Sequence, residues 1–236
     1  MGSDDLGGPT VGLFDTPAAT APPIARLLLA HGAGAPVTSP FMERMTELLA
    51  ARNMAVTRFE FAYMAARRRG GKRRPPPKAE HLIAEYLAAV DILATRDGEA
   101  APPLFIGGKS LGGRVASMAA SVLFDAGRVT GVVCLGYPFH PPGMPEKIRT
   151  SHLTDTAVPM LIVQGERDPF GSRAEVEDYA LSPRVEVVFV RDGDHDLGPR
   201  GGHGTTRREN MARAADAIAA FVESVNARRN SQNLEP

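Results

Sequence analysis

The sequence PLFIGGKSLGGR at residues 103–114 decides the fold. An apolar run of strand length leads into Gly108-Lys109-Ser110-Leu111-Gly112, and a helix-like stretch of small and apolar residues follows. A G-x-S-x-G motif between a strand and a helix holds its serine on a sharp, strained turn. Glycine at both flanks removes side chains that would collide with the strand or the helix. The motif therefore predicts Ser110 as an exposed nucleophile.

The same residues also match the end of a phosphate-binding P-loop through Gly108-Lys109-Ser110. That motif requires a glycine five residues before its second glycine, and this position is Pro103. Only three residues separate the apolar run from Ser110, too few to wrap backbone N–H groups around a phosphate. The sequence disfavours the P-loop interpretation.

Further apolar runs of strand length alternate with helical patterns along the chain. The expected strands are residues 25–30, 55–61, 104–106, 129–135, 160–163 and 185–190, with a short edge strand near 11–14. The expected helices are residues 41–52, 80–95, 111–126, 173–181 and 207–225. This alternation predicts an α/β fold, a mostly parallel sheet with helices on both faces. We expect one domain over residues 10–227, with flexible ends at 1–9 and 228–236.

Composition restricts the class of protein. The 236 residues are 43% hydrophobic and 23% charged, with a formal net charge of zero, as in soluble globular proteins. No apolar stretch approaches the roughly 20 residues of a membrane helix, and no overall charge attracts nucleic acid. The single cysteine, Cys134, lies in an apolar run, and the N-terminus lacks a secretory pattern. We therefore expect a cytoplasmic protein without membrane or nucleic-acid partners, its oligomeric state left open.

Polar residues follow the ends of the predicted strands, where functional groups gather in such sheets. A serine nucleophile needs a histidine to accept its proton and a carboxylate to orient that histidine. His195 follows the last strand within a short turn and is the predicted base. Asp168 is the predicted acid, favoured over Glu166 because Pro169 fixes the turn beside it. The alternatives are a surface histidine and a turn aspartate.

The cluster Asp192, Asp194, His195 and Asp196 also suggests a metal site. No second histidine stands at ligand spacing, and neighbouring carboxylates are typical of an exposed turn. The sequence therefore predicts no metal site and implies no cofactor.

Acyl transfer also requires N–H donors for the developing oxyanion. In a strand–turn–helix site these come from the residue after the nucleophile and from the loop after the first core strand, here Leu111 and Ala33. Gly32 and Tyr137 are further candidates for substrate contact. We expect His31 to form structural hydrogen bonds rather than to act in catalysis.

These motifs together resemble the α/β-hydrolase superfamily over residues 24–225. They are His31-Gly32-Ala33-Gly34, the serine motif, Gly165-Glu166-Arg167-Asp168 and Gly193-Asp194-His195. The chain is similar to small lidless members akin to dienelactone hydrolases, in particular a group of predicted serine hydrolases that includes a testis-expressed vertebrate protein. Dienelactone hydrolases proper use a cysteine where this chain has Ser110, so their substrate does not carry over. Only residues 136–157 stand where larger relatives insert a cap, which predicts a shallow, open site with one short helix near 146–151.

A basic run at residues 67–78 carries seven positive charges in twelve residues and no carboxylate. A solvated loop is the favoured interpretation, and an anionic substrate held by arginines such as Arg73 and Arg74 is the alternative. The run contains no aromatic residue for base stacking, which argues against nucleic acid.

The sequence thus favours a serine hydrolase that cleaves an ester, thioester or lactone of a small acyl substrate by means of Ser110, His195 and Asp168. The alternative is a catalytically silent protein of the same fold, which binds a partner through the basic run or an exposed Tyr137-Pro138-Phe139 region.

Overall fold

Seven strands form one sheet in the computed structural model, which describes residues 12–72, 75–98, 100–202 and 204–232. The strands are β1 (Leu13–Thr16), β2 (Ala25–Ala30), β3 (Met54–Phe59), β4 (Leu104–Lys109), β5 (Gly131–Leu135), β6 (Met160–Gly165) and β7 (Val185–Val190). Their order across the sheet is β1-β3-β2-β4-β5-β6-β7, and only the edge strand β1 runs antiparallel to its neighbour. The predicted mostly parallel sheet is confirmed.

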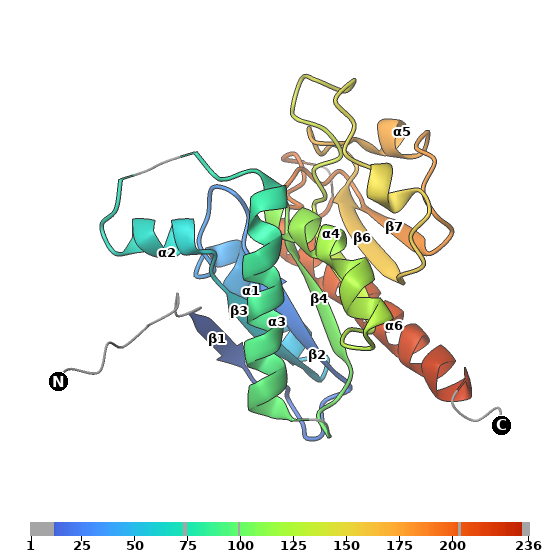
Figure 1. Cartoon of the computed structure of the whole chain (residues 1–236). Helices are drawn as coiled ribbons and strands as arrows, with labels where there is room; N and C mark the ends of the chain where they lie inside the picture. The colour runs from blue at the N-terminus through green and yellow to red at the C-terminus, as the bar shows by residue number, and fades with distance from the viewer. Residues whose placement is uncertain (1–11, 73–74, 99, 203, 233–236) are drawn as a thin grey trace.

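Helices cover both faces of the sheet (Figure 1). They are α1 (Pro40–Ala50), α2 (Ala62–Arg68), α3 (Ile83–Asp97), α4 (Leu111–Asp125), α5 (Arg173–Val176) and α6 (Arg207–Gln232), with 3-10 turns at Ala79–Leu82 and Ser151–Leu153. Alternate residues of one strand contribute to different cores. Leu28 packs with α3 and α4, whereas Leu27 and Leu29 pack with α1 and α6. Burial on both faces explains why these strands are almost continuously apolar.

The C-terminal helix is longer than the sequence predicts. We expected a helix over residues 207–225 and a flexible tail at 228–236, but α6 continues to Gln232. Residues 228–232 are therefore helical, which corrects that part of the expected tail, while residues 233–236 and 1–9 lie outside the described residues. Alanine and arginine are strong helix formers, so the helix can continue through these residues although they are exposed to solvent. Asn226 also anchors it, since Nδ2 donates to the Ile24 carbonyl oxygen at 3.0 Å.

Two predicted helices are shorter or displaced. The segment 173–181 is helical only over α5, because Asp178 and Tyr179 donate to carbonyl oxygens three residues back rather than four, as in a tightening turn. The short helix expected near residues 146–151 is instead the turn Ser151–Leu153.

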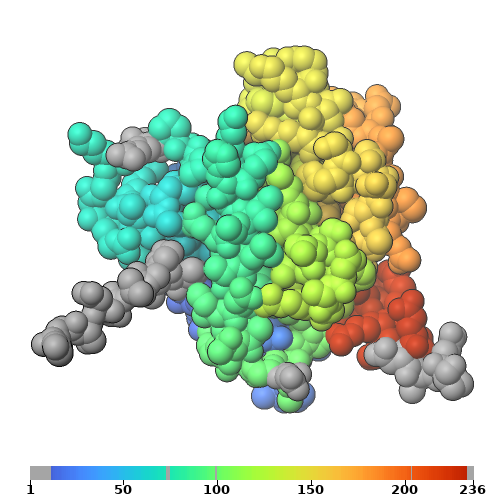
Figure 2. All heavy atoms as spheres, viewed as in Figure 1, coloured from blue at the N-terminus to red at the C-terminus, as the bar shows by residue number. Residues whose placement is uncertain are grey.

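The segment after β5 forms a loop rather than a domain. Figure 2 shows it as a small yellow lobe at the top of the molecule. Within the described ranges the predicted absence of a large cap agrees with the structure. Of the helices in those ranges, none has the length and apolar character needed to cross a bilayer.

Candidate active site

Ser110 lies on the sharp turn between β4 and α4, at the carboxyl end of the central strand. Its backbone has φ 51° and ψ −113°, a conformation that is costly for a residue with a side chain. A Cβ on Gly108 would collide with the Ala30 carbonyl oxygen, and one on Gly112 would lie 2.5 Å from that oxygen. The two flanking glycines thus let the turn approach β2, as the motif predicts.

Asp168 and His195 come together from the loops that follow β6 and β7. His195 Nδ1 lies 2.8 Å from Asp168 Oδ2. The Asp168 side chain is fully buried, and its Oδ1 accepts the Phe170 backbone N–H at 2.9 Å, so the carboxylate is fixed at both oxygens. The imidazole is 22% exposed and keeps Nε2 for another partner. His195 and Ser110 line the same cavity, so the structure brings the three predicted residues to one place.

Glu166, the carboxylate we did not choose, is occupied elsewhere. Its Oε2 accepts the Asp192 backbone N–H at 2.7 Å, and its Oε1 lies 3.2 Å from an Arg173 guanidinium nitrogen. These contacts hold the turn after β7 and leave Glu166 no contact with His195.

The aspartates around His195 build its loop. Asp192 Oδ1 forms ion pairs with Arg167 Nε at 2.8 Å and with Arg200 Nη2 at 2.7 Å. Although desolvation opposes it, hydrogen bonding from the Arg200 N–H groups lowers the pKa of Asp192 to about 2. Asp194 Oδ1 accepts the backbone N–H groups of Asp196 and Gly198. In the part of the chain that the structure describes, no three metal-ligating side chains gather at one point.

The loop after β2 lies against the serine turn. A Cβ built on Gly32 would be 3.7 Å from Ser110 Cβ, and Ala33 lines the cavity. Leu111 is the first residue of α4, where backbone N–H groups have no acceptor within the helix. Leu111 therefore adjoins Ser110 in the chain, Ala33 lines the cavity that contains Ser110, and their role as N–H donors stays a prediction.

His31 supports this loop from beneath. It is buried, with Nδ1 2.7 Å from the Gly32 carbonyl oxygen, and its Nε2 accepts the Phe61 backbone N–H at 3.2 Å. Burial lowers the pKa of His31, which favours this neutral, hydrogen-bonded imidazole. The expected structural role is confirmed.

Lys109 is a site residue that the sequence analysis did not identify. Its side chain is buried, Nζ donates to the His195 carbonyl oxygen at 2.7 Å, and it lies 3.3 Å from Asp196 Oδ1. Burial lowers the pKa of Lys109, and Asp196 opposes that shift. Lys109 thus ties the histidine loop to the serine turn. Its place directly before Ser110 was the available signal.

We expect Lys109→Met to lower turnover at this site by roughly tenfold to a hundredfold, because a shift of about 1 Å in an active-site side chain such as the predicted base has that effect. The substitution removes the contact with His195 and leaves Asp196 without its cation. Steady-state kcat of the purified variant measures the effect. Lys147→Met, at an exposed lysine of the loop after β5, is the matched control. Equal kcat in both variants would rule out this role for Lys109.

The cavity beside Ser110 has a volume of about 700 Å³, within the usual range for small-molecule sites. This volume can hold a small acyl substrate, and the expected shallow, open form of the site stays a prediction. Its walls come from the loop after β2, the start of α1, Phe170 and the first turn of α6. The lining residues beyond the predicted set include Phe41, Met42, Arg44, Phe170, Arg207, Arg208 and Met211. Phe170 packs on His195, with ring centroids 4.4 Å apart.

Tyr137 is not a substrate contact. Both Tyr137 and Phe139 are completely buried, and the Tyr137 hydroxyl donates to the Arg149 carbonyl oxygen at 2.9 Å. The prediction of an exposed surface at residues 137–139 is therefore wrong. These aromatic side chains pack into the core with α4, which leaves the interaction-module alternative without this surface.

The basic run does not border the cavity where the structure describes it. Arg68 forms an ion pair with Glu60 at 2.9 Å, and no described residue of 67–78 lines the cavity. Arg73 and Arg74 lie outside the described residues.

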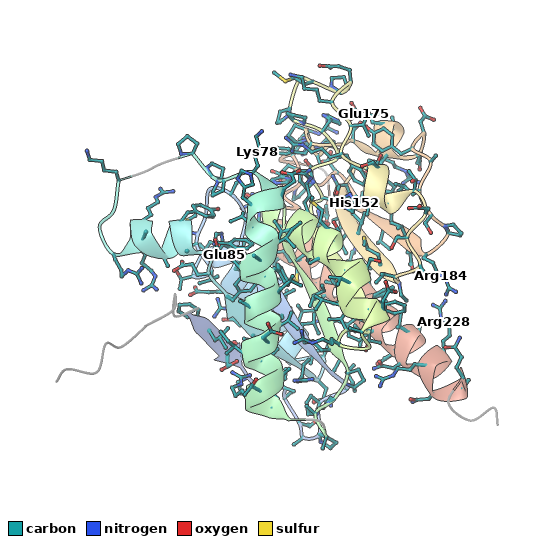
Figure 3. All side chains as sticks on the ribbon, in the orientation of Figure 1. Lys78, Glu85, His152, Glu175, Arg184 and Arg228 are labelled. Atoms are coloured by element: carbon teal, nitrogen blue, oxygen red, sulfur yellow. The ribbon has the colours of Figure 1, made fainter. Side chains whose placement is uncertain are left out.

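A serine–histidine contact occurs at α4, where Ser117 Oγ lies 2.9 Å from His152 Nε2 (His152 is labelled in Figure 3). The Ser117 hydroxyl donates to the Arg114 carbonyl oxygen at 2.8 Å, so Nε2 must be the donor in the contact with His152. Burial lowers the pKa of His152 to about 4. An imidazole that donates to the hydroxyl cannot take its proton, so this pair is a structural contact.

Comparison with known proteins agrees with the fold. The chain resembles Est1E from Butyrivibrio proteoclasticus, solved with ferulic acid, at 14% identity and TM-score 0.65, covering 92% of this chain and 96% of that one. It resembles a dienelactone hydrolase from Anabaena variabilis at 20% identity and TM-score 0.67, covering 91% of each chain. A lidless α/β serine hydrolase from Xanthomonas campestris matches at 14% identity and TM-score 0.60, with 92% and 88% covered.

The sequence itself matches the alpha/beta hydrolase domain family over residues 23–223, which is most of the chain. The strand order, the glycine-flanked serine turn and this match agree, and the chain belongs to the α/β-hydrolase domain family.

Proposed function

We propose that the protein is a serine hydrolase that cleaves an ester of a small acyl substrate through Ser110, His195 and Asp168. The observation that carries the proposal is the 2.8 Å contact between buried Asp168 and His195, at a cavity that also contains the strained Ser110. Each residue follows the end of a different strand, so the shared location results from the fold. A serine, an oriented imidazole and a buried carboxylate are the groups that acyl transfer uses.

In the proposed reaction, Ser110 Oγ attacks the acyl carbon while His195 Nε2 takes the hydroxyl proton. The Leu111 and Ala33 N–H groups stabilise the negative charge on the carbonyl oxygen. His195 then gives the proton to the departing alcohol, which leaves an acyl-enzyme on Ser110. A water molecule, deprotonated by His195, attacks this ester, and His195 returns the proton to Ser110 Oγ as the acid is released. Asp168 holds Nδ1 and stabilises the imidazolium formed in each half-reaction.

A fluorophosphonate probe followed by a panel of acyl esters tests this proposal. The probe should attach to Ser110, identified by mass spectrometry of the labelled peptide. Short-chain 4-nitrophenyl esters, a thioester and a lactone then distinguish the acyl class. Labelling at another residue, or no labelling together with no turnover, would overturn the proposal.

Substrates with an anionic group fit the cationic border of the cavity. Arg207 stands four residues and Arg208 three residues before Met211, so the three side chains lie on one side of α6. All three residues line the cavity. We expect kcat/KM for 4-nitrophenyl hemiglutarate to exceed that for its neutral carboxamide, and Arg208→Gln to reduce this ratio by about fivefold. Arg213→Gln, on another part of α6, should retain the ratio. If the ratio of kcat/KM for the anionic ester to that for the neutral ester were the same in Arg208→Gln and Arg213→Gln, Arg208 would have no role in substrate binding.

A further inference from the structure

A second cavity lies at the opposite end of the sheet from Ser110. Its walls come from segments that lead into β5, β6 and β7, from the end of α4 and from the last turns of α6. Its volume is about 490 Å³, again within the range of small-molecule sites. Catalytic groups of this sheet lie at the carboxyl ends of the strands, so the reaction makes no use of this cavity.

The floor of this cavity is apolar and its border is cationic. Phe124, Val129, Pro159 and Val225 supply apolar side chains. Arg184, Arg228 and Arg229 surround them, and the lining contains no carboxylate among the described residues.

The three arginines have no acidic partner within the described ranges: none forms an ion pair with a carboxylate there. Arg184 and Arg228 also border a smaller adjoining cavity, which contains Glu186. Figure 3 shows their two side chains near one another, one before β7 and the other near the end of α6. Guanidinium groups of like charge repel one another, and a bound anion removes that repulsion.

Helix stability explains only part of this arrangement. Arginines in the last turns of a helix interact favourably with its dipole, which accounts for Arg228 and Arg229. Arg184 belongs to a different segment, directly after Pro183, so the sequence of α6 does not account for its place in the cavity. Arg228 is also held in place, because Nη2 donates to Ser224 Oγ at 2.8 Å. A fixed guanidinium loses less side-chain freedom when it binds a ligand.

We propose that this cavity binds a small amphipathic anion, a carboxylate or phosphate attached to a short apolar body. The anion contacts Arg184 and Arg228, whose planar guanidinium groups suit the oxygens of either acid. The apolar body lies on Phe124, Val129 and Val225. Thr130, directly before β5, is also part of the lining.

Isothermal titration calorimetry of the full chain with hexyl phosphate tests the proposal. Hexanol and inorganic phosphate carry the two halves of the probe separately, and both should bind more weakly than hexyl phosphate. Arg184→Gln and Arg228→Gln should each weaken hexyl phosphate binding by about fivefold. High salt should weaken binding as well, because exposed charges are screened. Arg213→Gln, an exposed arginine earlier on α6, should bind as the unmodified chain does.

Binding at the other cavity has a distinct signature. Hexyl phosphate bound beside Ser110 would lose affinity in Arg208→Gln, and a loss confined to that variant would overturn the proposal. The proposal would also be overturned if the Arg184 and Arg228 variants bound hexyl phosphate as tightly as the unmodified chain, or if the unmodified chain did not bind it. Sedimentation with phosphatidylserine vesicles, without binding of free hexyl phosphate, would assign the arginines to a membrane surface instead. Thermal melting of each ligand-free variant checks that it is folded.

Discussion

Ser110→Ala is expected to abolish covalent labelling by a fluorophosphonate and to lower kcat for 4-nitrophenyl esters by about 10⁴-fold or more. The reason is chemical, since the variant retains the cavity, His195 and the N–H donors but has no oxygen to form the acyl-enzyme. The alanine keeps the Cβ, so the turn retains its backbone strain and packing. Gel fluorescence of the labelled protein measures the loss of labelling, and a steady-state assay measures the loss in kcat.

Ser117→Ala is the matched control for this experiment. It removes a serine that contacts His152, and that contact lies on α4 away from the cavity. The control should label and turn over substrate as the unmodified chain does, with a loss of stability of about 1 kcal/mol from the lost hydrogen bonds. Full labelling of Ser110→Ala would remove Ser110 as the nucleophile. Loss of labelling only in Ser117→Ala would point to the Ser117–His152 pair.

Local sequence predicts the sheet well because each central strand is buried on both faces. The run at residues 25–30 becomes β2 with the predicted bounds, and residues 185–190 become β7. The serine turn is predictable for the same local reason, since glycines must stand where the turn meets β2. The ends of α5 and α6 were not predictable in this way. They depend on which distant segments pack against each helix and on how far its solvent-exposed residues remain helical.

The cavity walls that come from distant segments escaped prediction, whereas the three predicted residues each follow the end of a strand. Asp168 could be chosen over Glu166 because Pro169 follows it, and the structure gives Glu166 other partners. Arg208 and Met211 line the cavity only because the start of α6 packs near α1, and no local pattern carries that information. Tyr137 misled us for a related reason. It follows a strand end, as functional residues do, but its ring turns into the core beside α4.

The choice between the two carboxylates gives the second large expected effect. Asp168→Asn should lower kcat by about 10³-fold to 10⁴-fold, because an amide at this position favours the wrong imidazole tautomer and cannot stabilise the imidazolium. His195→Ala should be about as damaging. Steady-state kcat and the rate of fluorophosphonate labelling measure both effects, since each depends on activation of Ser110.

Glu166→Gln is the control that makes this test specific to Asp168. An amide keeps the size of Glu166 and one acceptor oxygen for the Asp192 N–H, so the loop that carries His195 should remain close to its place. Its loss of the Arg173 ion pair, a partly exposed contact, should cost less than about 1 kcal/mol of stability. Activity near that of the unmodified chain is therefore expected. If Glu166→Gln abolished turnover while Asp168→Asn remained active, the carboxylate that orients His195 would be Glu166, and the 2.8 Å contact of Asp168 would serve only to fix the turn.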